Sequence, residues 1–164
     1  MKILSAYYKI LCLFICSGFL LNITQSQEFT RDFTSNARLN EINPQAFRHF
    51  KKNFPSISNE YWYKTQNGFI VKYIDRNIIS QAFYDQRGSF EYGIKYFEEK
   101  DLSREMKNRI NKEFPGYSID VVSEVISDEN IVYLLSLKNK MMVKNIMMTE
   151  NELKVIEDIS YASR

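Results

Sequence analysis

The residues that could support catalysis are few. His49 is the single histidine of the chain and stands beside Arg48 and Lys51 in a predicted helix, so we expect it to be exposed on the polar side of that helix. A nucleophile needs an adjacent base, and no cysteine lies beyond the first 26 residues to pair with His49. The sequence therefore favours neither a zinc site nor Ser-His catalysis, and we predict a non-enzymatic protein without a cofactor.

Two clusters could bind metal ions, and both have a structural interpretation. Glu98, Glu99 and Asp101 lack the glycine and the alternating oxygen ligands of a calcium loop, and acidic residues just before a helix stabilise its N-terminus. The methionine pairs Met141-Met142 and Met147-Met148 could bind Cu(I) through their thioethers. Adjacent residues on a strand point to opposite faces, so core packing explains these methionines better. We predict no metal site.

Tyrosine is the residue type that most favours a binding role. The chain has 11 tyrosines, and aromatic side chains are enriched where proteins bind each other. Several predicted strands are apolar on both faces, so a single helix leaves part of an aromatic face uncovered. We take six tyrosines of the first four strands as the candidate protein-binding surface: Tyr61, Tyr63, Tyr73, Tyr84, Tyr92 and Tyr96.

The segments that carry these residues occur twice. An acidic residue, an apolar residue and a helix-capping residue at 41–43 precede a helix that ends in Phe54-Pro55, and the same order at 101–103 leads to Phe114-Pro115. Internal self-similarity of this kind indicates a repeated structural unit. We predict one domain over residues 41–160, made of the repeats 41–99 and 100–160.

Each predicted repeat begins with a short amphipathic helix. Asn43 is a good N-cap and Pro44 suits the first helical position, while Ser103 caps the second helix. Apolar residues three and four positions apart predict one buried stripe on each helix. The first stripe is Phe47, Phe50 and Phe54, and the second is Met106, Ile110 and Phe114.

After each helix the apolar period changes from four residues to two, which predicts strands. Short turns rich in Asn, Asp, Gly and Lys join consecutive strands, and such turns connect antiparallel neighbours. The sequence therefore predicts an α+β fold in which each repeat is one helix followed by a four-stranded antiparallel meander. We expect strands near residues 60–65, 69–74, 78–84, 89–97, 119–126, 130–137, 140–148 and 152–159.

The first residues have the pattern of a secretory signal peptide. Lys2 and Lys9 precede an apolar run of about a dozen residues that is too short to span a bilayer, and Thr24 and Ser26 suit a cleavage site. We predict a cleaved signal peptide over residues 1–26, a flexible leader over 27–40 and a periplasmic or secreted location. Removing two lysines from a chain of net charge +2 leaves a neutral protein, so we expect neither nucleic-acid nor membrane binding.

The sequence resembles the PepSY-like, β-lactamase-inhibitor-like exported proteins of Bacteroidetes. The resemblance rests on Ala82-Phe83-Tyr84-Asp85 with Gly88 and on Phe114-Pro115-Gly116-Tyr117, and it covers roughly residues 42–159. It implies two helix-plus-four-strand units with both helices on one side of a concave eight-stranded sheet surface. It also implies a protein that inhibits or chaperones a secreted hydrolase.

Two functions follow from these patterns. The first is an exported, monomeric binding module whose sheet face or turns bind another exported protein, a hydrolase being one candidate. The alternative is a small-ligand or metal carrier that uses a trough between the repeats, lined by Met142, Met148 and Tyr84.

Overall fold

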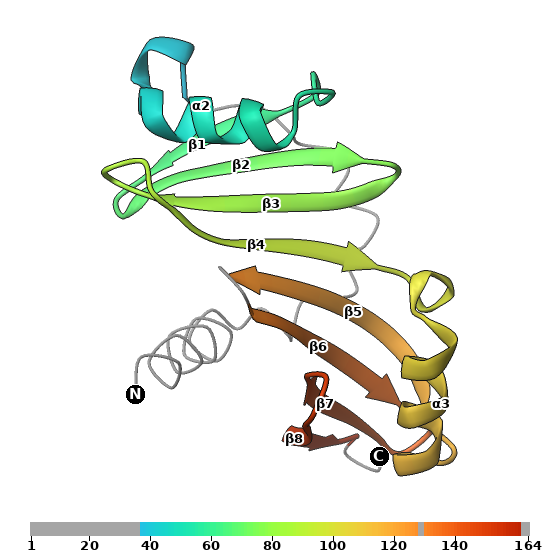
Figure 1. Ribbon diagram of the computed structural model, residues 1–164. Coiled ribbons are helices and arrows are strands. Elements are labelled where there is room, and N and C mark those ends of the chain that lie inside the picture. Colours follow the sequence, from blue (N-terminus) through green and yellow to red (C-terminus); the bar gives the residue numbers. More distant parts are fainter. Residues whose placement is uncertain (1–36, 128–129, 162–164) are drawn as a thin grey trace. The chain divides into compact units, whose positions relative to one another are not determined.

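An eight-stranded antiparallel sheet and two α-helices form the part of the chain that the structure, a computed structural model, describes: residues 37–127 and 130–161 (Figure 1). The predicted signal peptide and residues 27–36 of the predicted leader lie outside this part. In chain order the elements are η2 (Leu39–Glu41), α2 (Pro44–Asn53), β1 (Tyr61–Thr65), β2 (Gly68–Asp75), β3 (Ile78–Asp85), β4 (Phe90–Phe97), η3 (Glu99–Asp101), α3 (Arg104–Glu113), β5 (Ser118–Ser127), β6 (Asn130–Lys138), β7 (Met142–Met148) and β8 (Leu153–Ser160).

Residues 37–40, the last four of the predicted leader, are held by specific contacts. The Ala37 N–H donates to the Trp62 carbonyl on β1 at 3.2 Å, and the Arg38 N–H donates to the Glu41 carboxylate at 2.8 Å. Leu39–Glu41 forms the short 3-10 helix η2. These contacts attach residues 37–40 to β1 and to Glu41, just before the start of α2.

The two helices begin and end at residues that the capping pattern predicts. The Asn43 carboxamide accepts a hydrogen bond from the Gln45 N–H at 2.8 Å, and the Ser103 hydroxyl accepts one from the Met106 N–H at 3.2 Å. These bonds satisfy amide groups that have no partner within a helix. Phe54 and Phe114 are the C-caps of α2 and α3.

The strands follow one another across the sheet in the order β1 to β8, and every neighbouring pair is antiparallel. The predicted α+β class and the antiparallel meander are therefore confirmed. The interpretation of the two halves as tandem repeats stays a prediction. No helix within residues 37–127 and 130–161 is long and apolar enough to cross a membrane.

Strand register places the contacts of both helices on the same face of the sheet. Val71, which packs in the core under α2, pairs with Ala82, and Ala82 pairs with Gly93. Phe97 is four residues beyond Gly93 on β4 and pairs with Val122 in the core under α3. Residues an even number apart on a strand share a face. No helix of residues 37–127 and 130–161 covers the opposite side, which we call the helix-free face. On β1 to β4 it carries Tyr61, Tyr63, Ile70, Lys72, Ile74, Ile79, Gln81, Phe83, Tyr92, Ile94 and Tyr96.

Each helix buries its apolar stripe in a core of different composition. The core under α2 is rich in rings, with Phe50, Trp62, Tyr73 and Tyr84 buried together. The core under α3 is mainly aliphatic, with Ile110, Leu135 and Ile146 among its members. Of the predicted stripes, Phe50 and Ile110 are almost fully buried. The other four are half-buried at the margins of the two cores: Phe47, Phe54, Met106 and Phe114.

The strands β1 and β8 form the two edges of the sheet. β8 has a register shift, because Asn145 pairs with Glu157 while the next residue, Ile146, pairs with Val155. Two residues of β7 thus face three residues of β8, which is the pattern of a β-bulge. The bulge interrupts the regular outer edge of the last strand.

Candidate binding surface

The six candidate tyrosines lie on both faces of the sheet. Tyr73 and Tyr84 belong to the core under α2 and expose only 5% and 2% of their surface, so their assignment to a binding surface is wrong. Tyr73 follows Val71 at the strand period of two, and this parity turns it toward α2. The other four lie on the helix-free face: Tyr61, Tyr63, Tyr92 and Tyr96.

The exposed part of the helix-free face lies over β1 and β2. Tyr61 exposes 37% of its surface and Ile74 exposes 39%. The half-buried Tyr63 lies on the other side of Tyr61 from Ile74, because Tyr61 pairs with Lys72 and Tyr63 pairs with Ile70. The Lys72 ammonium lies 5.1 Å from the centre of the Tyr63 ring. Burial lowers the pKa of Lys72 and raises the pKa of Tyr63. An apolar ring beside a partly desolvated cation suits contact with another protein.

Tyr92 and Tyr96 are half-buried further along the same face. The Tyr92 ring stacks on Phe83 with 4.3 Å between ring centres and an interplanar angle of 18°. The Gln81 amide donates to the Tyr96 hydroxyl at 3.3 Å. Burial, with Glu91 adding to it, raises the pKa of Tyr92 to about 12, and burial raises the pKa of Tyr96 as well. Both phenols are therefore neutral at neutral pH.

The middle of the helix-free face is closed. Ile94, Val125 and Val132 occupy successive strands β4 to β6 and expose 6%, 1% and 5% of their surface. An apolar residue that is already buried gains little from a further contact. Among the described residues, the most exposed apolar side chains of this face are therefore Tyr61 on β1 and Ile74 on β2.

His49 is not exposed as predicted. It is half-buried, its Nδ1 lies 3.1 Å from the Tyr84 hydroxyl, and its ring stacks on Phe90 with 5.3 Å between centres. The face that α2 buries is centred on Ala46 and Phe50, which brings His49 to its margin. His49 supports the aromatic core in this position, and no cysteine or second histidine lies near it within the described residues.

Lys51, two residues further along α2, is half-buried as well. Its ammonium donates to the Ile57 carbonyl at 2.9 Å and forms an ion pair with Glu60. The same group lies 5.9 Å from the centres of the Phe47 and Phe50 rings. Lys51 therefore ties the helix to the segment that enters β1.

The trough of the predicted carrier does not form. Tyr84 is buried in the core under α2, whereas Met148 exposes 2% of its surface in the core under α3. Met142 is half-buried at the start of β7. These three side chains do not line a common cavity, because Tyr84 and Met148 fill two separate cores.

The predicted acidic cluster has a local structural role. Glu98 N–H donates to the Asp101 carboxylate at 3.1 Å, which caps η3, and Lys100 forms an ion pair with Glu98 at 2.7 Å. Across residues 37–127 and 130–161, no group of three or more His, Cys, Asp or Glu side chains could hold a metal ion.

Sequence reasoning missed a polar network between the two cores. The Glu124 carboxylate, 8% exposed, accepts from the Lys95 ammonium at 2.8 Å and from the Tyr133 hydroxyl at 2.7 Å. Burial, the hydrogen bond to Glu124 and the negative charge of Glu124 raise the pKa of Tyr133 to about 12. Register pairs Lys95 with Glu124 and Glu124 with Tyr133. A cross-strand alignment of opposite charges was the signal that could have revealed it.

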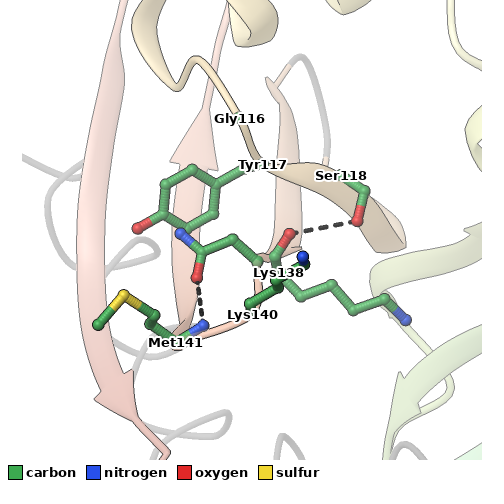
Figure 2. A pocket seen from close by; sticks show the side chains of 7 residues that line it. Gly116, Tyr117, Ser118, Lys138, Lys140 and Met141 are labelled. Atoms are coloured by element: carbon green, nitrogen blue, oxygen red, sulfur yellow. Dashed lines mark hydrogen bonds between the residues drawn. The ribbon is translucent and has the colours of Figure 1, made fainter.

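A cleft of about 690 Å³ lies beside the loops at the start of β5 and between β6 and β7 (Figure 2). Residues from the connection between α3 and β5 and from the turn between β6 and β7 line it. They are Gly116, Tyr117, Ser118, Lys138, Asn139, Lys140 and Met141.

Several solved structures share this fold. A DUF2874 family protein from Bacteroides uniformis has a TM-score of 0.59 and 11% identity over 73% of this chain and 91% of that chain. A protein from Bacteroides eggerthii, provisionally described as periplasmic, has a TM-score of 0.59 and 11% identity over 73% of this chain and 88% of that chain. A BLIP-like protein from Bacteroides fragilis has a TM-score of 0.60 and 8% identity over 75% and 89% of the two chains.

These identities are low, so the likeness concerns the fold alone. No protein-family model matches the chain, and no curated protein matches it.

Proposed function

We propose that this chain is an exported, non-enzymatic binding module that binds another exported protein through its helix-free face. The observation that carries the proposal is the aromatic surface over β1 and β2, where the exposed Tyr61 lies between the exposed Ile74 and the half-buried Tyr63. Tyrosine supplies a large, rigid contact area together with a hydroxyl group, which is the composition of protein interfaces.

Three further features support this function. The fold is similar to that of a BLIP-like protein and of a protein provisionally described as periplasmic. The first residues carry the pattern of a signal peptide, which implies export to the periplasm or beyond. We interpret the two halves, 41–99 and 100–160, as tandem repeats of a PepSY-like unit, because helix caps, helix ends and strand order correspond between them.

A site-specific crosslinking experiment tests this proposal. A photoreactive phenylalanine analogue at Tyr61 should capture a partner from the periplasmic or secreted fraction. The same analogue at Lys112, which is exposed on α3, should capture none and serves as the control.

The captured partner is then purified for binding measurements. The exchanges Tyr61→Ala and Tyr92→Ala should each weaken its binding by about tenfold, as truncation of an interface tyrosine does, while Lys112→Ala leaves it unchanged. Equal capture at both positions, or none at either at high protein concentration, would argue against the helix-free face as a binding surface.

A further inference from the structure

The two connections beside the cleft at the start of β5 differ in length from the corresponding connections in the first half. In the second half residues 114–117 connect the helix to its first strand, and residues 139–141 form the turn between the second and third strands. In the first half these connections are residues 54–60 and residues 76–77. The second half thus combines a shorter helix connection with a longer turn, and the cleft lies beside these two segments (Figure 2).

Local hydrogen bonds hold the walls of the cleft in place. The Asn139 carboxamide oxygen accepts from the N–H groups of Met141 and Met142 at 2.8 and 2.9 Å, which fixes the turn. The Ser118 hydroxyl donates to the Lys138 carbonyl at 3.2 Å and joins β5 to β6 at the rim. A preformed site loses little conformational entropy when it binds a ligand. Its volume is also within the range typical of ligand sites.

One of the lysines around the cleft has no counter-charge in the part of the chain that the structure describes. Lys138 pairs with Asp120, and Lys144, whose ammonium lies 5.8 Å from the Tyr117 ring centre, pairs with Asp158 at 2.6 Å. Lys140 has no carboxylate partner within the described residues. Among the described residues, the rim therefore presents one uncompensated positive charge, that of Lys140.

Apolar groups lie next to this charge. Met141 exposes 75% of its surface, and the half-buried Tyr117 lines the same cleft. Tyr161, 51% exposed, donates its N–H to the Met141 carbonyl at 2.8 Å, so the apolar surface continues beyond the cleft. A ligand longer than one residue could cover both parts.

We propose that the cleft binds an extended peptide segment of a partner protein in which an acidic side chain lies next to an apolar one. The carboxylate pairs with Lys140, and the apolar side chain packs against Tyr117 and Met141. This site is separate from the tyrosine surface of β1 and β2 and uses side chains of the second half only.

Methionine-methyl NMR tests the proposal. The probe is the capped peptide acetyl-Gly-Leu-Glu-Leu-Gly-amide, and the control peptide has Lys in place of Glu. Titration with the acidic peptide should shift the methyl signals of Met141 and Met142 and leave that of Met106 on α3 in place. The exchange Lys140→Glu should weaken binding about fivefold, which is the upper end of the range for an exposed ion pair. The matched exchange Lys52→Glu on the exposed side of α2 should have no effect.

Two results would overturn the proposal: no shift of the Met141 signal at millimolar peptide, or an equal shift with the basic peptide. The variant Tyr61→Ala separates this test from that of the tyrosine surface, because it should bind the acidic peptide as the unchanged protein does. Failure of crosslinking at Tyr61 would leave the methionine titration unaffected.

Discussion

Residues 42–97 and 102–160 each contain a ten-residue helix followed by four strands, yet their cores have different chemistry. The core under α2 contains Phe50, Trp62, Tyr73 and Tyr84, with ring centres 5.1 to 5.8 Å apart. The core under α3 is built mainly from Ile, Val and Leu. Aromatic packing brings polar atoms inside, and the contact between Tyr84 and His49 is one result. The same architecture is thus stabilised either by ring contacts that need polar partners or by aliphatic packing that needs none.

The largest effect should come from removing the central side chain of each core. Phe50→Ala should destabilise the protein by about 4 kcal/mol and Ile110→Ala by about 3 kcal/mol, since truncation leaves a cavity in a buried site. Phe50 should matter more because its ring contacts Phe54, Trp62 and Tyr73. Urea melts of both variants measure the difference. A larger loss for Ile110→Ala would reverse the ranking of the two cores.

The junction between the cores should give the next largest effect. Glu124→Gln removes a buried negative charge that Lys95 and Tyr133 both contact, and we expect a loss of about 2 kcal/mol. The exposed Glu91→Gln on β4 is the control and should change stability by less than about 0.5 kcal/mol. If urea melts gave the same loss of unfolding free energy for both exchanges, the network would contribute nothing to stability.

Alkaline pH should weaken the first half before the second. Burial, with Asp75 as a smaller contribution, raises the pKa of Tyr73 to about 12, and burial raises that of Tyr84 too. A raised folded-state pKa contributes stability that is complete below pH 10, the unfolded value, and is lost as pH rises toward 12. The loss should be about 1 kcal/mol per tyrosine by pH 11.

Urea melts from pH 9 to 11 measure this decline, and amide exchange locates it. Protection on β2 and β3, which carry Tyr73 and Tyr84, should fall before protection on β7, which carries no tyrosine. The double exchange Tyr73→Phe and Tyr84→Phe should reduce the pH dependence, and Tyr92, Tyr96 and Tyr133 should account for what remains. An unchanged slope in that variant would exclude these two phenols as its origin.

The smallest effects should come from the helix caps. Ser103→Ala should cost about 1 kcal/mol through the bond to Met106. Asn43→Ala should cost slightly more, because its side-chain amide also donates to the Gln86 carbonyl at 3.2 Å. Thermal melts of the two variants compare them directly. An equal loss would mean that the contact with Gln86 contributes nothing.

Local signals predicted the fold because each depends on neighbouring residues. Asn43-Pro44 and Ser103 define helix starts, and short polar turns define hairpins, so helix positions and the antiparallel meander could be derived without tertiary information.

The face of the sheet or helix on which an individual side chain lies could not be derived in the same way. β2 is apolar on both sides, with Val71 and Tyr73 on one and Ile70 and Ile74 on the other, so strand period alone does not show which side a helix covers. A small rotation of α2 likewise moves His49 from solvent to the core margin. The Glu124 network depends on the register between β4 and β5, which are separated along the chain by η3 and α3. Periodicity within one strand does not contain that information.

The bulge in β8 affects whether another chain can pair with the outer edge of the sheet. A regular outer strand offers a row of amide and carbonyl groups on which another chain could grow. Here the extra residue between Val155 and Glu157 breaks that row, and Lys154 and Asp158 place charges along the same strand. Both devices oppose edge-to-edge pairing of one molecule with another, so the protein should remain dispersed at high concentration.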